Sequence, residues 1–121
     1  MGDERVAVLV VPDLMFQPRI EAALRARGLR AEVVASAPSL DAALSGGPAL
    51  AVIDLHAAGF DALDAVRRAH AAAVPVLAFG RHTEPATLRA AREAGAQVVV
   101  PRSQLVEELP RLIAEAMDGE K

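Results

Sequence analysis

Cysteine, tryptophan and tyrosine are absent from the sequence, and only three of its 121 residues are phenylalanine. Without cysteine the chain can form no disulfide, no thiolate metal site and no cysteine nucleophile, which fits a reducing compartment. Hydrophobic residues nevertheless make up 53% of the chain. Because so few of them are aromatic, we expect a core that is built mainly from closely packed Ala, Val and Leu side chains.

Basic patches and long apolar runs are also missing. The formal net charge is −3 and no basic run is longer than Arg67-Arg68, which argues against nucleic-acid binding. The apolar run at residues 6–11 is too short to span a bilayer, and the acidic first residues do not resemble a signal peptide. We therefore expect a cytoplasmic protein without nucleic-acid or membrane partners. It should form a single domain over residues 1–121, with no output domain.

Five short apolar runs alternate with five helical patterns along the chain. The runs predicted to be strands cover residues 6–11, 31–35, 49–53, 74–79 and 98–100. The helical patterns cover about residues 18–27, 39–44, 62–71, 83–94 and 105–116, with Asp61 and Thr83 as expected N-caps and Pro110 as an expected kink. This alternation predicts an α/β fold: a five-stranded, doubly wound parallel sheet of flavodoxin-like order 2-1-3-4-5, with helices on both faces.

Polar side chains gather at the predicted carboxyl ends of the strands, where ligands bind in such sheets. In the order 2-1-3-4-5 the first and third strands are neighbours, so we expect Asp13 and Asp54 to lie close together. Two neighbouring carboxylates repel each other, and Mg²⁺ is the natural cation to relieve that repulsion. Alternatively, Asp54 only caps the loop that follows it. His56 and His82 fall at the same end, either as transition-metal ligands together with Asp54 or as solvated loop residues.

Four segments together resemble the receiver domain of two-component response regulators, of the chemotaxis-regulator type. They are residues 8–13, 51–55, 74–80 and 91–96. The resemblance implies that Asp54 accepts a phosphoryl group from a partner histidine kinase. It also implies a weak Mg²⁺ site that is formed by Asp13, Asp54 and the backbone carbonyl of His56.

Several positions depart from the pattern of that family. Pro12 replaces one residue of its acidic pair, Gly80 replaces the Ser or Thr that bonds the phosphoryl oxygen, and Arg102 replaces its Lys. Val99 replaces its switch aromatic. Losing a single preorganised donor typically costs about 10² to 10³ in rate. We therefore predict an atypical receiver, or pseudo-receiver, of a phosphorelay-type pathway, which acts by protein-protein interaction with weak or no phosphorylation of Asp54.

Two other interpretations stay open. The first is a working phosphoacceptor receiver that uses Asp54 and Mg²⁺. The second is a cobalamin-binding module, because Asp54-x-His56-x-x-Gly59 matches the D-x-H-x-x-G loop in which a histidine binds cobalt. No catalytic triad or glycine-rich phosphate loop is present, so we do not expect an enzyme.

The expected partners are proteins, either a histidine kinase or an output protein, and the expected oligomeric state is a monomer or a weak homodimer. The surface that receivers commonly use for docking offers Arg89 and Arg92 beside Glu107 and Glu108 in this sequence. A solvated charged face is the simpler interpretation of these four residues.

Overall fold

Five parallel strands form one sheet in the order β2-β1-β3-β4-β5, which confirms the predicted topology. The computed structural model describes residues 5–118, so both ends of the domain expected over residues 1–121 lie outside the described residues. The strands are β1 (Arg5–Val10), β2 (Leu29–Val33), β3 (Leu50–Asp54), β4 (Val76–Gly80) and β5 (Val98–Pro101).

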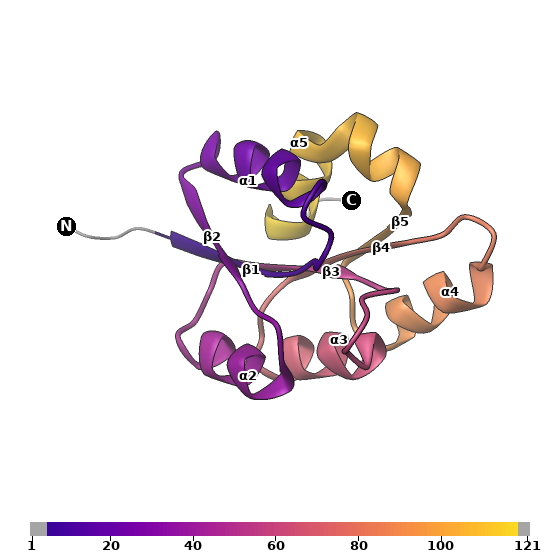
Figure 1. Ribbon diagram of the computed structural model, residues 1–121, viewed down its shortest axis with the longest axis horizontal. Coiled ribbons are helices and arrows are strands. Elements are labelled where there is room, and N and C mark those ends of the chain that lie inside the picture. The colour runs from indigo at the N-terminus through magenta and orange to yellow at the C-terminus, as the bar shows by residue number, and fades with distance from the viewer. Residues whose placement is uncertain (1–4, 119–121) are drawn as a thin grey trace.

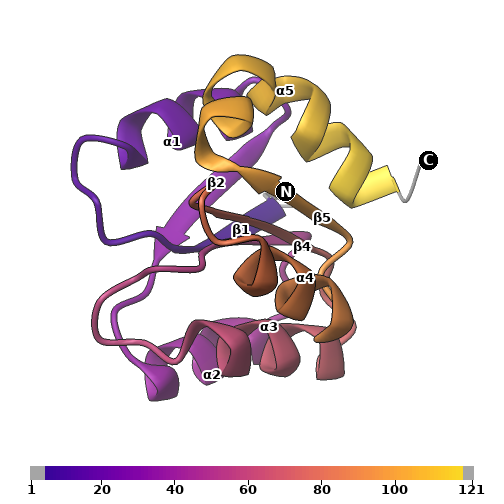
Figure 2. The same cartoon turned by 90° about the vertical axis from the view of Figure 1, so that its right-hand side faces the viewer.

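The sheet is covered by helices on both faces, as predicted (Figures 1 and 2). On one face lie α1 (Gln17–Arg25) and α5 (Arg102–Asp118), and on the other lie α2 (Ala37–Ser45), α3 (Ala62–Ala71) and α4 (Pro85–Glu93). None of the helices within residues 5–118 is long and apolar enough to cross a membrane.

The core consists of two hydrophobic clusters, one on each face of the sheet. Alternate residues of a strand enter opposite clusters, since successive strand side chains point to opposite faces. In β1, for example, Val8 and Val10 join the cluster under α2, α3 and α4, whereas Ala7 and Leu9 join the cluster under α1 and α5. All residues of β3 and β4 are buried, which explains why these segments read as continuous apolar runs.

Helix α4 begins differently from the prediction. We expected Thr83 to cap it, but the N-cap is Glu84, and no side chain makes a capping hydrogen bond there. The prediction of Thr83 as the cap was therefore wrong. The reason is Pro85, which occupies the first helical position and thereby makes the residue immediately before it the cap.

Two other local predictions are confirmed. Asp61 caps α3, because its side chain accepts a hydrogen bond from the backbone N–H of Asp64 at 3.1 Å. Helix α5 is interrupted at Glu108, whose φ of −125° and ψ of 27° are not helical, two residues before Pro110. At the other end of this helix, its first residue, Arg102, pairs with Asp13 and lines a cavity next to the ends of β3 and β4.

Candidate functional site at the carboxyl edge of the sheet

Asp54 is the last residue of β3 and lies at the carboxyl edge of the sheet. It is only 7% exposed, and no other polar or charged residue among residues 5–118 is buried. One carboxylate oxygen, Oδ1, accepts a hydrogen bond from the backbone N–H of His56 at 2.9 Å. Asp54 therefore caps the loop that follows it, which is the structural role that the sequence left open. This role engages only one of its two oxygens.

Asp54 also lines a cavity of about 180 Å³ at this edge of the sheet. The cavity is lined by six residues: Asp54, His56, Phe79, Gly80, Arg81 and Arg102. The sequence analysis had singled out Asp54, His56, Gly80 and Arg102 as site residues, and the fold brings all four together. Phe79 was missed, because its apolar side chain at the end of a strand looks like an ordinary core residue. The cavity wall thus combines one carboxylate with two guanidinium groups.

The imidazole of His56 lies against Gly80. Its Nε2 accepts a hydrogen bond from the backbone N–H of Arg81 at 3.1 Å, and this bond joins the loop after β3 to the loop after β4. A Cβ atom at Gly80 would lie 3.1 Å from that same Nε2 and 3.2 Å from Cδ2 of Leu88. The imidazole therefore lies tightly against the position that the first side-chain atom of any larger residue 80 would take.

The same hydrogen bond bears on the metal-binding hypotheses for His56. A neutral imidazole that accepts through Nε2 carries its proton on Nδ1, so neither ring nitrogen offers a free lone pair to cobalt or to another transition metal. His82 lies exposed in the turn before α4. Within residues 5–118, no group of three or more His, Cys, Asp or Glu side chains is placed to hold a metal ion.

Asp13 forms an ion pair with Arg102, whose Nη2 lies 2.6 Å from its Oδ2. Its other oxygen, Oδ1, accepts a hydrogen bond from the backbone N–H of Met15 at 2.9 Å. The hydrogen bond from Arg102 is the main cause that lowers the pKa of the Asp13 carboxyl below its ordinary value. Each carboxylate oxygen of Asp13 therefore has a partner already.

Two phenylalanine rings hold the guanidinium of Arg102 in place. Its central carbon lies 4.5 Å from the centroid of Phe16 and 6.0 Å from that of Phe79, within the range of a cation-π interaction. The two rings contact each other edge to face, with their centroids 5.3 Å apart. Two of the three phenylalanines in the sequence are thus used to position one arginine.

The predicted magnesium ligands are Asp13, Asp54 and the backbone carbonyl of His56. Mg²⁺ requires several oxygen ligands in a near-octahedral arrangement. Asp13 does not line the cavity that Asp54 lines, both of its oxygens are engaged, and Pro12 supplies no carboxylate. The side chains as arranged do not fit the ion, and a Mg²⁺ site at Asp13, Asp54 and the carbonyl of His56 stays a prediction.

The predicted docking face is partly occupied by internal contacts. Arg92 donates a hydrogen bond to the backbone carbonyl of Val99 at 3.2 Å, and Glu108 pairs with Arg111 on the same helix. Val99 itself is buried in the hydrophobic cluster under α4. Only part of this face presents free charged groups to a partner.

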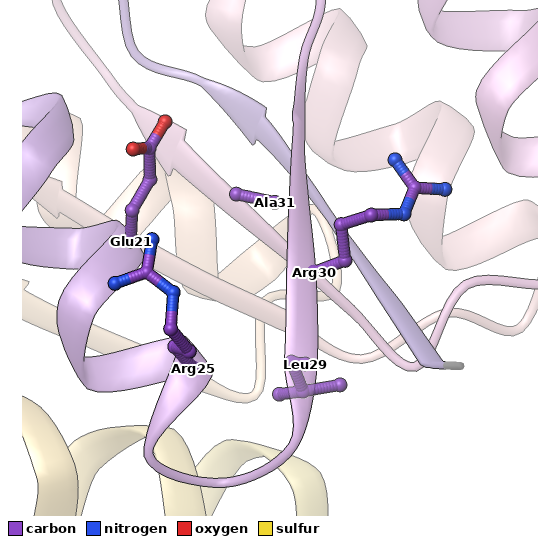
Figure 3. A pocket seen from close by; sticks show the side chains of 5 residues that line it. All are labelled: Glu21, Arg25, Leu29, Arg30 and Ala31. Atoms are coloured by element: carbon purple, nitrogen blue, oxygen red, sulfur yellow. The ribbon is translucent and has the colours of Figure 1, made fainter.

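Two polar clusters lie away from this corner. At the edge of the sheet, α1 and β2 enclose a cavity of about 350 Å³ with mixed charge, lined by Glu21, Arg25, Leu29, Arg30 and Ala31. Figure 3 shows Arg25 and Arg30 on opposite sides of β2, so their guanidinium groups do not converge on a shared anion.

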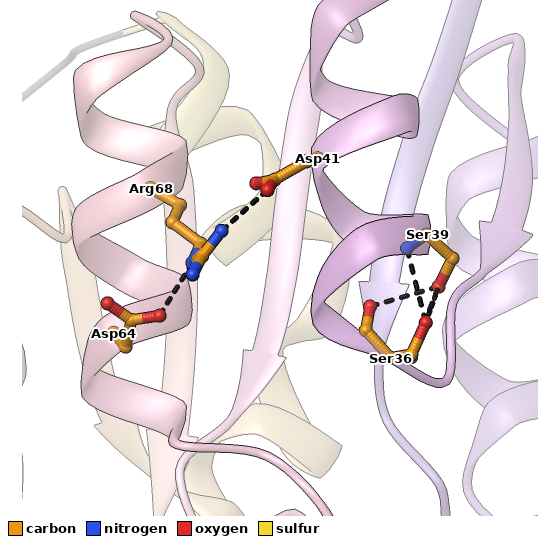
Figure 4. Close-up of polar contacts among 5 residues, drawn as sticks. All are labelled: Ser36, Ser39, Asp41, Asp64 and Arg68. Atoms are coloured by element: carbon orange, nitrogen blue, oxygen red, sulfur yellow. Dashed lines mark hydrogen bonds and ion pairs between the residues drawn. The ribbon is translucent and has the colours of Figure 1, made fainter.

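The second cluster joins α2 to α3 (Figure 4). Arg68 reaches from α3 to Asp41 on α2 and to Asp64 on its own helix, each at 2.6 Å, and these carboxylates raise its pKa. Beside it, Ser36 and Ser39 form a reciprocal capping box at the start of α2. These contacts join the two helices, and Asp64 and Arg68 also line a small cavity of about 80 Å³ between α2 and α3.

The comparisons with known proteins agree with this description of the fold. No protein-family model matches the sequence, and no curated protein matches it. Solved structures do match. A CheY-like response regulator receiver domain from Methanospirillum hungatei has a TM-score of 0.79 and 16% identity, covering 98% of this chain and 96% of that one. A response regulator from Thermotoga maritima has a TM-score of 0.78 and 14% identity, with coverages of 94% and 98%.

A third structure carries a metal. The receiver domain of a sensor histidine kinase from Pseudomonas aeruginosa, with a magnesium ion coordinated in its active-site cleft, has a TM-score of 0.77 and 21% identity, with coverages of 94% and 98%. The fold of this chain is therefore that of response regulator receiver domains, as the resemblance in the sequence implied.

Proposed function

We propose that this chain is an atypical receiver-like signalling domain of a phosphorelay-type pathway. It acts by docking to a protein partner, either a histidine kinase or an output protein, and not as an enzyme. Asp54 accepts a phosphoryl group weakly or not at all. The observation that carries the proposal is the contact of His56 with Gly80, because it fills the space that a phosphate-binding hydroxyl would need.

Phosphoryl transfer to Asp54 needs positive charge and hydrogen-bond donors around the transferred group. Catalysis of this step depends on positioning and on electrostatic stabilisation of the phosphoryl oxygens. Gly80 offers no hydroxyl, and the guanidinium of Arg102 is committed to Asp13 and to two aromatic rings. Each missing donor slows such a reaction by about 10² to 10³. A slow or absent reaction is therefore the consequence of the arrangement.

The hydrogen bond between His56 and Arg81 also bears on switching. A phosphorylation switch requires a segment near the modified residue to change its conformation when the modification arrives. Here a direct hydrogen bond of 3.1 Å already ties these two loops together in the unmodified chain. A fixed surface, recognised in one conformation, fits this arrangement better than a surface that alternates between two.

A working phosphoacceptor with Mg²⁺ is the second candidate function. It is favoured by the placement of Asp54, which ends β3, is buried and lines a cavity. The cobalamin interpretation has no such support, because the lone pair of its candidate ligand, His56, is used.

Incubation with a small-molecule phosphodonor and Mg²⁺, followed by intact-mass spectrometry, separates the two candidates. We expect the wild-type protein to gain little or no phosphoryl mass, with the Asp54→Asn variant as the baseline for modification at other sites. Rapid and near-complete modification that disappears in Asp54→Asn would establish the working receiver instead.

A further inference from the structure

Arg102 occupies an unfavourable position for a cation unless another group compensates it. It is the first residue of α5, and the amino-terminal end of a helix carries a partial positive charge that disfavours a nearby positive side chain. The carboxylate of Asp13, 89 positions earlier in the sequence, lies 2.6 Å away and compensates both charges. The ion pair thus joins the loop after β1 to the beginning of α5.

The loop that carries Asp13 is itself folded around this residue. Its carboxylate accepts the N–H of Met15, and its backbone carbonyl accepts the N–H groups of Phe16 and Gln17, each at 3.0 Å. Phe16 in turn stacks on the guanidinium of Arg102. The same residue that pairs with the arginine therefore places the ring that holds the arginine in position.

We propose that Arg102 is a resident cation that takes the place of a divalent metal ion at this corner, so that the conformation of the corner does not depend on Mg²⁺. Arg102 pairs with the carboxylate of Asp13 in the loop after β1, and it also lines the cavity that Asp54 lines, so a covalently attached positive charge is permanently present between these two elements of the corner. Its planar fork suits a carboxylate, and its weak hydration suits contact with aromatic rings.

This role differs from that of a lysine that contacts a phosphoryl group. The guanidinium of Arg102 instead pairs with a carboxylate of the chain, Asp13, and lies over the rings of Phe16 and Phe79. The inference concerns metal binding alone and does not require the proposed function to hold.

A Mg²⁺ titration that follows the backbone amide resonances of Asp13, Asp54 and His56 by NMR tests the inference, with no phosphodonor present. We compare the wild type with Arg102→Gln, which removes the charge. Arg111→Gln is the matched control, because it removes the same charge from the same helix at an exposed ion pair. Arg102→Met serves as a second variant if the glutamine perturbs folding, since methionine retains favourable contact with an aromatic ring.

We expect no saturable shift in the wild type or in Arg111→Gln, and a saturable shift in Arg102→Gln or Arg102→Met. The gain in Mg²⁺ affinity should be at least about tenfold, the lower end of what a neighbouring charge does to the affinity of a carboxylate for a proton. Adding Pro12→Asp should increase it further.

Saturable Mg²⁺ binding at these amides in the wild type would overturn the inference, and so would a folded charge-removing variant that gains nothing over Arg111→Gln. Because phosphorylation is not measured, either result leaves the proposed function to be judged by its own experiment. Conversely, a wild type that is phosphorylated and yet insensitive to Mg²⁺ would contradict the proposed function and leave this inference in place.

Discussion

Replacing Gly80 with serine tests whether the space next to residue 80 is taken. The backbone itself permits a side chain there, because Gly80 is not among the glycines with positive φ. The obstacle is packing: the new Cβ would lie 3.1 Å from Nε2 of His56 and 3.2 Å from Cδ2 of Leu88. Such overpacking costs about 1–3 kcal/mol, offset by about 0.5–1 kcal/mol because glycine itself weakens a strand. We expect Gly80→Ser to lose about 1–2 kcal/mol of unfolding free energy.

The second perturbation is His56→Ala, which removes the imidazole and its hydrogen bond from Arg81. Loss of that bond alone costs about 0.5–1.5 kcal/mol. In the double variant, however, the serine enters the space that the imidazole has left, and only the flexible tip of Leu88 still has to move. The double variant should therefore be more stable than the sum of the two single changes predicts, by about 1 kcal/mol.

Urea unfolding of the four proteins, followed by far-ultraviolet circular dichroism, measures this coupling. Circular dichroism is the suitable probe because the chain contains no tryptophan or tyrosine. Gly46→Ser is the matched control, since its Cβ would meet nothing closer than the carbonyl oxygen of Ala43 at 3.4 Å, and it should combine additively with His56→Ala. If Gly80→Ser and His56→Ala are also additive to within about 0.5 kcal/mol, the imidazole does not occupy the space and the reasoning is refuted.

Two further predictions concern other contacts. Gly95→Ala should lower the free energy of unfolding in urea by about 2–4 kcal/mol, because φ at Gly95 is +117° and the new Cβ would lie 2.4 Å from Cγ of His70. The control Gly46→Ala should be neutral or slightly stabilising. Equal effects at the two sites would contradict the steric argument. The pKa of Asp13 is lowered by Arg102, so its stabilising effect is present above the unfolded pKa of 3.8 and is lost as the pH falls through the lower folded pKa. Asp13→Asn should therefore be less stable than the wild type at neutral pH, and it should lose less stability than the wild type on acidification. If the urea midpoints of both proteins fall in parallel below about pH 4, the ion pair does not contribute in this way.

The fold was predictable because its signals are local. Strands such as β3 and β4, covered on both faces, must be continuously apolar, and the glycines and prolines between the elements mark where each one ends. The predicted strand order made β1 and β3 neighbours, so the segments that follow these two strands were expected to start side by side at the same edge of the sheet. Asp54 stood out for the same reason, since it ends a strand in which every other residue is apolar.

The chemistry of the corner was harder to predict, because it depends on contacts between residues far apart in the sequence. The sequence suggested that Asp13 and Asp54 share a cation, whereas the structure gives Asp13 a partner 89 positions away in Arg102. Likewise, Gly80 was recognised as a missing hydroxyl, but the imidazole that takes its place comes from His56 in a different loop. Such choices depend on side-chain rotamers, which no periodicity in the sequence encodes.

The role of α4 and α5 as a docking surface stays a prediction. Arg89 and Glu107 are exposed, while Arg92 and Glu108 are engaged within the domain. Charged groups that already have internal partners contribute less to a new interface, because binding must first break those contacts. Exposed charges of this kind are expected to influence the rate and the salt dependence of association more than its affinity.

The central claim is that four residues of this corner, and not the fold, keep phosphorylation of Asp54 slow or absent. These residues are Pro12, His56, Gly80 and Arg102. The most direct test of this claim is the rate at which a small-molecule phosphodonor modifies Asp54 in the wild type and in a repaired variant that combines Pro12→Asp, His56→Ala, Gly80→Thr and Arg102→Lys. With Mg²⁺ present and the mass followed over time, we predict modification of the repaired variant at least about 10²-fold faster than that of the wild type. Equal rates in the two proteins, whether both are modified rapidly or both slowly, would contradict the account.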